Sequence, residues 1–307
     1  MCEKRSTKNL IEIAGVTKEE IERLFLLADQ AKAGKLENTL TDKIIASCFF
    51  EASTRTRLSF ESAIYRLGAK VIGFSDSKQT SFGQKGESLE DTIVMLNAYA
   101  DAIIMRHPEK GSAKLAASVS DIPVINAGDG ANEHPTQTLL DLYTIQEKFS
   151  DIDGLKIAMV GDLKYGRTVH SLSYALAHFN NIEIYYVAPE SLQIPAEISQ
   201  KLSQQGVKVH KRVELEEVIS EVNVLYMTRL QQERFEGDEL HQFEYRLTRE
   251  MLERSAKDEL IVLHPLPRVK EISPDVDATD YAWYFKQAKN GVYMRQAILY
   301  NLFNIPC

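Results

Sequence analysis

Residues 53–57, with the sequence Ser-Thr-Arg-Thr-Arg, gather side chains well suited to hold an anion. They follow an apolar run and precede an expected helix, where free N–H groups and the helix dipole favour negative charge. The hydroxyls of Ser53, Thr54 and Thr56 add donors, and the planar fork of Arg55 matches a phosphate. An ordinary helix N-cap is the alternative, but a cap needs only one hydroxyl. We therefore favour a phosphate site over capping alone.

Cationic or imidazole side chains recur after six further expected strands. They are Lys78 and Lys85, Arg106 and His107, His134, Lys164 and Arg167, Arg229, and His264 with Arg268. Any one of them alone is explained equally well by ordinary surface composition. In an open parallel sheet, however, ligands bind beyond the carboxyl ends of the strands. In a chain of net charge −8, this recurrence predicts a site for a ligand with several negative charges.

The polar segment at residues 75–86 contains two glycines and lacks an apolar face. It is long enough to act as a lid that brings Ser81 and Lys85 to a bound anion. A solvated surface loop is the equally favoured alternative.

Three histidines precede prolines, and His134 is the one best placed for catalysis. A Gly-Asp-Gly turn at residues 128–130 comes before it, and Gln137 follows about one helical turn later. An imidazole and an amide there are able to donate to, and accept from, a carbonyl-type group. A histidine that simply caps the following helix fits the spacing as well.

Other chemistries find little support in the sequence. No histidine pair has HxxxH or HExxH spacing and no CxxC pair occurs, so a bound metal is not expected. The GxSxG motif and the Walker-type phosphate loop are also missing, so neither a protein nucleophile nor a cofactor is expected. Gly161, Asp162 and Gly166 resemble a dinucleotide loop without its GxGxxG spacing. Arg167 beside them suits a carboxylate at least as well as a cofactor phosphate.

Apolar runs and helical spacing alternate along the chain. Strands are expected at residues 44–50, 71–74, 102–105, 123–126, 157–160, 182–187, 207–213, 222–227 and 260–263. Helices are expected from about residue 17 to 34 and at residues 58–67, 89–100, 112–118, 135–149, 168–178, 196–204 and 293–303. Strands separated by helices imply right-handed crossovers and parallel sheets.

The fold class is therefore α/β, with two consecutive doubly wound parallel-sheet domains and the active site in the cleft between them. Residues 150–154 look like a hinge, which gives domains at residues 1–150 and 151–290. The C-terminal helix, about residues 291–307, is free to pack back on the first domain.

Composition narrows the class of protein. The 307 residues are 44% hydrophobic and 26% charged, as in a globular protein with a packed core. The acidic balance argues against a nucleic-acid binder. No run approaches a membrane span, the N-terminus lacks a signal-peptide core, and three scattered cysteines suit a reducing compartment, so we expect a cytoplasmic protein.

Six motifs occur here in one order: STRTR (53–57), QKGE (84–87), MRHP (105–108), GDGANEHPTQ (128–137), GDLKYGRT (161–168) and HPLPR (264–268). Across essentially its whole length the chain resembles the aspartate/ornithine carbamoyltransferase family. The STRTR motif is common to both branches. The ornithine members place a cysteine after the histidine where this chain has His264-Pro265, whereas Arg167, Arg229 and Gln231 suit a dicarboxylate. The resemblance therefore implies transfer of a carbamoyl group from carbamoyl phosphate to L-aspartate, an early step of pyrimidine biosynthesis. Ornithine or another acceptor, and a non-catalytic anion-binding protein, remain alternatives.

The resemblance also implies roles for individual residues. Ser53, Thr54, Arg55 and Thr56 hold the phosphate; Arg106 and His134 contact the carbonyl oxygen; Gln137 and the carbonyls of Pro265 and Leu266 hold the amino group; Arg167, Arg229 and Gln231 bind aspartate; and Ser81 and Lys85 come from a neighbouring subunit, Lys85 reaching both substrates. A homotrimer with shared sites is thus the smallest complete unit. The Leu266-Pro267 bond is expected to be cis.

Two positions depart from many family members. Ala52 stands where many have proline, and Gln84 where some have a second lysine. The Ala52 form resembles bacterial chains that assemble with zinc-bearing regulatory chains. Because this chain has no CxxC pair, such a zinc would belong to the partner of an allosteric assembly.

Overall fold

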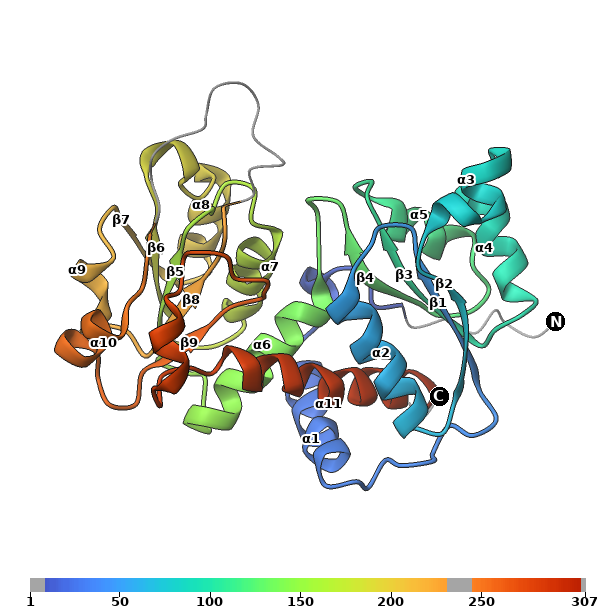
Figure 1. Ribbon diagram of the computed structural model, residues 1–307, viewed down its shortest axis with the longest axis horizontal. Coiled ribbons are helices and arrows are strands. Elements are labelled where there is room, and N and C mark those ends of the chain that lie inside the picture. Colours follow the sequence, from blue (N-terminus) through green and yellow to red (C-terminus); the bar gives the residue numbers. More distant parts are fainter. Residues whose placement is uncertain (1–8, 231–244, 305–307) are drawn as a thin grey trace. The chain divides into compact units, whose positions relative to one another are not determined.

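The computed structural model describes residues 9–230 and 245–304. The chain divides into two compact units, unit 1 (Met1–Leu139 with Asn290–Cys307) and unit 2 (Leu140–Lys289). Each unit is built around one parallel β-sheet (Figure 1).

The sheet of unit 1 has the strand order β2-β1-β3-β4, with all neighbours parallel. Its strands are β1 (Ile44–Phe49), β2 (Lys70–Phe74), β3 (Ala102–His107) and β4 (Val124–Asp129). The inner strands are apolar without alternation because both faces are covered. Ala46, Cys48 and Ile103 pack on one face beneath the helices there, and Ser47 of the other face lies 3.4 Å from Glu61 of α2.

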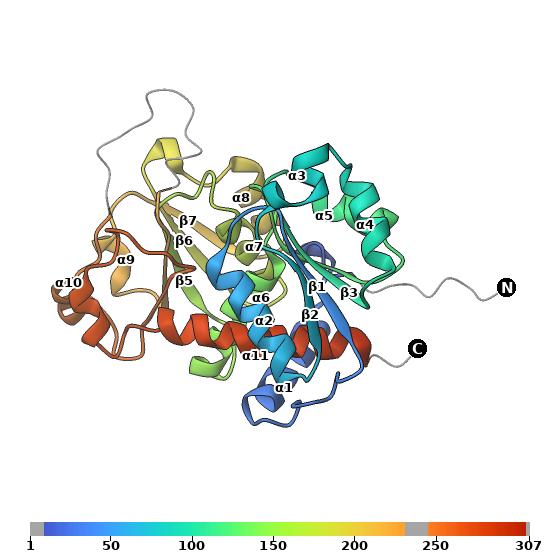
Figure 2. The same cartoon turned by 45° about the vertical axis from the view of Figure 1, so that its right-hand side comes forward.

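The helices of unit 1 follow the capping signals of the sequence. They are α1 (Lys18–Lys32), α2 (Thr54–Arg66), α3 (Ser81–Lys85), α4 (Leu89–Asn97), α5 (Ser112–Val119) and the start of α6 (Pro135–Phe149), with short 3₁₀ turns η1 (Ile13–Gly15) and η2 (Ser77–Gln79). Thr17 and Glu20 form the predicted capping box of α1. Figure 2 shows α2 and α4 running along opposite faces of this sheet.

The sheet of unit 2 has the order β7-β6-β5-β8-β9 and is again wholly parallel. Its strands are β5 (Lys156–Val160), β6 (Glu183–Val187), β7 (Lys208–Arg212), β8 (Val224–Met227) and β9 (Ile261–Leu263). Its helices are α7 (Arg167–Leu176), α8 (Ala196–Gln204), α9 (Glu216–Ile219), α10 (Arg249–Ser255) and the start of α11 (Tyr284–Phe303), with 3₁₀ turns η3 (Glu190–Leu192) and η5 (Pro274–Ala278).

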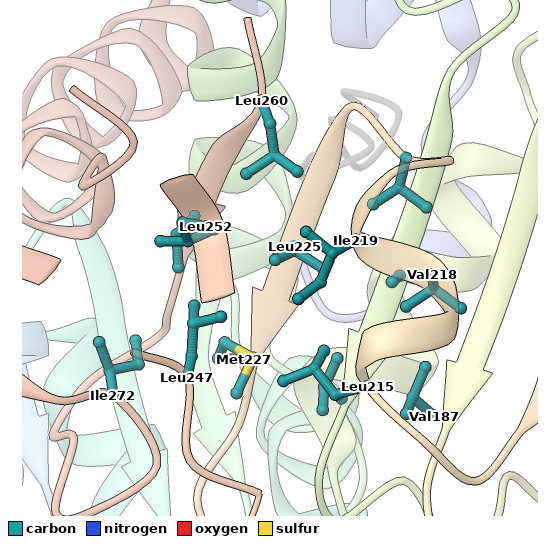
Figure 3. Packing of buried hydrophobic residues seen from close by; sticks show 14 of the residues in the cluster. Val187, Leu215, Val218, Ile219, Leu225, Met227, Leu247, Leu252, Leu260 and Ile272 are labelled. Carbon is teal, nitrogen blue, oxygen red and sulfur yellow. The ribbon is translucent and has the colours of Figure 1, made fainter. Parts of the chain in front are cut away.

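Both faces of this second sheet are also buried. On one face Leu225 and Met227 pack with Leu215 and Val218 beside α9 (Figure 3). On the other face, the hydroxyl of Tyr186 donates a hydrogen bond of 2.7 Å to the hydroxyl of Ser173 in α7. The predicted fold class, two parallel-sheet α/β units, is confirmed.

All nine predicted strands are present, with ends displaced by at most three residues. Two predicted helix starts were wrong, and the short helices α9 and α10 were not predicted. Helix α2 begins at Thr54, so most of the STRTR motif lies in its first turn, and α11 begins at Tyr284, nine residues earlier than predicted. The segment at residues 75–86 forms η2 and α3, and it does carry an apolar side chain, that of Phe82.

None of the helices in the described ranges is both long enough and apolar enough to cross a membrane.

Candidate active site

The strand orders bring the predicted site residues of each unit to one edge of its sheet. In unit 1, β1 connects to β2 on one side and β3 connects to β4 on the other, so the loops after β1 and β3 diverge. In unit 2, β5 and β8 diverge in the same way. Such switch points are where open α/β sheets bind ligands. The STRTR motif and Arg106 flank the first switch point, and Arg167 and Arg229 flank the second.

The start of α2 distinguishes between the two interpretations of the STRTR motif, an anion site and an ordinary helix cap. Ser53 occupies the N-cap position, yet its side chain makes no capping hydrogen bond. The first backbone bond of the helix runs from the N–H of Arg57 to the carbonyl of Ser53 at 3.2 Å, so the three preceding N–H groups point out of the helix start. Capping by the Ser53 hydroxyl is therefore not the reason for this motif.

The two arginines of the motif differ in their surroundings. Arg57 lies 3.7 Å from Glu61, one turn along α2, in an ion pair that stays on the helix surface. Arg55 is exposed in the first turn, next to exposed Thr54 and buried Thr56. Arg57 therefore has an ion-pair partner on the surface of its own helix, whereas Arg55 lies in the first turn itself.

Arg106 is held at the end of β3 by the loop that follows β1. One of its guanidinium nitrogens lies 2.8 Å from a carboxylate oxygen of Glu51, and another donates to the carbonyl of Ala127 at 3.4 Å. Its side chain is 13% exposed, so this charge is largely shielded from water and the carboxylate of Glu51 neutralises it. Glu51 was not predicted as a site residue, although a carboxylate directly after an apolar strand was a signal for it.

His134 is buried, 5% exposed, and stands directly before α6. Its carbonyl accepts from the N–H of Gln137 at 2.9 Å, which sets that half-buried amide one turn further along. Gly130 has φ +55 and lies so close to the backbone of residues 108–110 that a Cβ there would come within 2.5 Å of the Pro108 carbonyl. The predicted tight turn before His134 is confirmed.

The carboxylate of Asp129 is the centre of that turn, a role that was not predicted from the sequence. One oxygen accepts from the side chain of Asn126 at 2.9 Å and the N–H of Glu133 at 3.1 Å. The other accepts from the N–H of Gly111 at 2.9 Å and the side chain of Asn132 at 3.0 Å. This buried carboxylate therefore fixes the path of the chain into His134.

Asp129→Asn is expected to lower the free energy of unfolding by about 3 kcal/mol, because either amide orientation would direct an NH₂ group at two donors. Urea denaturation with an unchanged m value would measure this loss. Asp151→Asn is the matched control, since Asp151 is exposed and accepts a single N–H, from Asp153. Equal losses in the two variants would contradict the assigned role of Asp129.

Ser81 and Lys85 lie at the two ends of α3, and both are exposed. Between them the ring of Phe82 packs edge-on against Phe50 with centroids 5.0 Å apart, and 5.9 Å from the ring of His107. This packing fixes α3 on the sheet of its own unit. The segment is therefore more ordered than the solvated loop considered from sequence.

Several groups from the sequence inventory serve the fold. His107 is buried with Nδ1 accepting from the N–H of Glu109 at 3.0 Å, and burial lowers its pKa. Arg268 pairs with Asp277 and with the hydroxyl of Tyr284. Burial raises the pKa of the Cys48 thiol to about 12, so it is no nucleophile.

In unit 2 the ends of β5 and β8 approach closely. Gly161 has φ +116, and a Cβ there would come within 2.4 Å of the Thr228 carbonyl. This contact places Arg167, 7% exposed at the start of α7, and half-buried Arg229 at neighbouring strand ends. Gln231 lies outside the described residues.

Pro265 and Leu266 follow β9, beside β8. The Leu266-Pro267 bond is cis, as predicted, and Leu266 has φ +58. The imidazole of His264 accepts from the N–H of Leu266 at 2.7 Å and contacts Glu271 at 2.7 Å through its other nitrogen.

Glu271 gives this turn a pH dependence. Burial alone would raise the pKa of Glu271, but hydrogen bonds from His264 and backbone N–H groups outweigh it and lower the pKa from 4.5 to about 2. The folded state then binds this proton less readily than the unfolded state, so the stabilisation is complete above about pH 4.5 and is lost as the pH falls toward 2.

Acidification from about pH 5 to about pH 2 is expected to remove about 3 kcal/mol of unfolding free energy through Glu271. Urea denaturation of the wild type and Glu271→Gln across this range would measure the difference. Parallel pH profiles for the two proteins would contradict the assignment.

Comparison with known proteins relates this geometry to a family. Residues 8–147 match the family model described as aspartate/ornithine carbamoyltransferase, carbamoyl-P binding domain, and residues 153–302 match the Asp/Orn binding domain. An aspartate carbamoyltransferase catalytic subunit of Vibrio campbellii is 52% identical over 97% of each chain.

Solved structures agree with the sequence comparison. The catalytic subunit of M. jannaschii aspartate transcarbamoylase has a TM-score of 0.88 and 47% identity, covering 96% of this chain and 97% of that one. The Trypanosoma cruzi aspartate transcarbamoylase in complex with carbamoyl phosphate and aspartate has a TM-score of 0.89 and 40% identity, covering 96% of each chain. The two family domains together match nearly the whole chain, and the solved relatives share its fold. The chain therefore belongs to the aspartate/ornithine carbamoyltransferase family.

Proposed function

We propose that this chain is an aspartate carbamoyltransferase, which transfers the carbamoyl group of carbamoyl phosphate to the amine of L-aspartate. The observation that carries the proposal is the pair of cationic switch points, one at a helix start suited to phosphate and one with two arginines suited to a dicarboxylate. Relatives named as aspartate enzymes, one of them bound to carbamoyl phosphate and aspartate, favour this acceptor over ornithine.

In the reaction, the amine nitrogen attacks the carbamoyl carbon, the new C–N bond forms, and the bond from carbon to the phosphate oxygen breaks. Negative charge grows on the carbonyl oxygen before the phosphate leaves. Arg106 and His134 are the donors proposed for that oxygen, and one such donor is worth about 3 to 4 kcal/mol. The departing phosphate takes the amine proton, so no protein base is needed.

The remaining residues bind and orient the two anions. Ser53, Thr54, Arg55 and Thr56 hold the phosphate; Gln137 with the Pro265 and Leu266 carbonyls holds the amino group; Arg167, Arg229 and Gln231 hold the aspartate carboxylates. Bringing two unit charges to ~4 Å costs about 4 kcal/mol at an effective dielectric near 20, which the arginines offset. Residues 1–150 with the C-terminal helix form the carbamoyl-phosphate domain, and residues 151–290 the aspartate domain.

The site is completed by a second copy of the chain in a homotrimer, whose Ser81 and Lys85 reach the neighbouring site. Exposed apolar side chains on unit 1 support association: Leu58 is 51% exposed and Tyr65 64% exposed on α2, and Ile72 of the edge strand β2 is 39% exposed. Zinc-bearing regulatory chains are proposed as further partners, in a cytoplasmic assembly that serves pyrimidine biosynthesis. Size determination alone and beside a candidate regulatory chain tests this.

Purified protein is expected to form carbamoyl aspartate from carbamoyl phosphate and aspartate, with no comparable turnover of ornithine or other amines. A colorimetric ureido assay over a panel of acceptors measures this. Turnover with ornithine instead would overturn the acceptor. Phosphate binding without any turnover would point to a non-catalytic anion-binding protein.

A further inference from the structure

The turn after β9 is fixed by one imidazole that is 1% exposed. Nδ1 of His264 accepts the N–H of Leu266 at 2.7 Å, so this nitrogen carries no proton. The proton is therefore on Nε2, which donates to a carboxylate oxygen of Glu271 at 2.7 Å. The tautomer and the ring plane of His264 are both set by these contacts.

Glu271 also closes the turn from its far end. Its second carboxylate oxygen accepts the N–H of Val269 at 3.1 Å and that of Lys270 at 2.9 Å. Glu271 thus binds the imidazole on one side and the returning backbone on the other. The six residues between His264 and Glu271 are held as one closed unit.

The backbone of His264 is anchored separately. Its N–H donates to the side chain of Gln287 at 2.8 Å, and that amide donates to Asp141 at 2.6 Å. Tyr226 of β8 donates to the same carboxylate at 2.8 Å. The imidazole of His264 therefore projects from a backbone that is itself held in place, and it supports the turn from a fixed position.

Leu266 needs that support because its φ of +58 is unfavourable for a side chain with a Cβ. A residue before proline prefers an extended backbone. Without the hydrogen bond that the Leu266 N–H donates to Nδ1 of His264, the peptide at Leu266 is expected to relax and to rotate the adjoining carbonyls.

We propose that His264, oriented by Glu271, is the positioning residue that aims the Pro265 and Leu266 carbonyls and thereby makes the site select an acyl phosphate bearing an N–H donor. The proposal rests on the proposed function. A carbamoyl group donates two N–H bonds, whereas the methyl group of an acetyl phosphate donates none. Sites built around such bonds discriminate strongly against analogues that lack the donor.

The test compares three probes: carbamoyl phosphate, acetyl phosphate and inorganic phosphate, each titrated as a ligand of the full chain by calorimetry. His264→Leu is expected to weaken carbamoyl phosphate binding about ten- to a hundredfold while changing the other two affinities less than about twofold. Glu271→Gln is expected to shift the selectivity in the same direction. His264→Asn should recover part of it, because an asparagine oxygen accepts the N–H two residues on.

Tyr186→Phe is the matched control, since it removes a buried hydrogen bond of unit 2, to Ser173, that does not touch this turn. Thermal midpoints of all variants report folding, and His264→Asn and Glu271→Gln carry the test if His264→Leu does not fold. Equal weakening of all three probes, or unchanged selectivity in both retained variants, would overturn the proposal. Failure of the wild type to bind carbamoyl phosphate would overturn the proposed function together with it.

Discussion

Arg55→Ala is expected to lower kcat/KM for carbamoyl phosphate by at least about a hundredfold, because it removes up to two charge-assisted hydrogen bonds to the phosphate, each worth about 1.5 to 3 kcal/mol. Steady-state kinetics at saturating aspartate would measure this. The folded state should be little affected, since Arg55 is exposed in the first turn of α2. A large kinetic effect without a shift in thermal midpoint would assign the loss to ligand binding.

Arg57→Ala is the matched control on the same helix. It removes a charge two residues away, but from a side chain that pairs with Glu61 at 3.7 Å along the surface of α2. A surface ion pair of this kind is worth about 0 to 1 kcal/mol, so kcat/KM should change less than about threefold. Comparable losses in the two variants would show that the motif acts through overall charge and not through a positioned fork.

Two inactive variants, Lys85→Ala and Arg55→Ala, are expected to regain activity when their subunits are exchanged. In a trimer whose sites are shared between neighbours, every mixed trimer holds one site with both wild-type residues. An equal mixture should then recover about a quarter of wild-type activity. Activity assays before and after a cycle of mild dissociation and reassembly measure the gain.

The control for this experiment is a mixture of Arg55→Ala with Arg106→Ala, two residues of the same proposed half-site. Each mixed site then takes both groups from one chain and lacks one of them, so activity should stay at the level of the single variants. Because all of these variants lose one positive charge, one chain of each pair carries a charged tag, and native electrophoresis then verifies mixing. Persistent inactivity of the Lys85 and Arg55 pair despite such mixing would contradict shared sites.

The fold was predictable because buried parallel strands leave a strong local signal. The run from Ile44 to Phe49 is apolar except for Ser47, and it forms β1 where it was predicted. Helix starts were less predictable. The Ser/Thr-rich residues before Leu58 favour a turn as much as a first helical turn, so the start of α2 was placed four residues too late.

The candidate site was predictable in its cations and not in its carboxylates. Arg55 and Arg106 stand out as positive charges after strands, whereas Glu51, Asp129 and Glu271 read as ordinary acidic surface residues. The role of each carboxylate depends on partners that only the folded chain brings near it, such as the N–H of Gly111 beside Asp129. Contacts of this kind depend on the register of β3 against β4, which no local pattern encodes.

The turn before His134 also affects the long-term chemical stability of the chain. Asp129 and Gly130 form an Asp-Gly pair, a sequence prone to succinimide formation when the glycine nitrogen attacks the aspartate carboxyl carbon. Here the nitrogen of Gly130 donates to the carbonyl of His107 at 2.9 Å, and both carboxylate oxygens of Asp129 are occupied by donors. The attack geometry is therefore closed off in the folded protein, and this covalent weak point is exposed only when the chain unfolds.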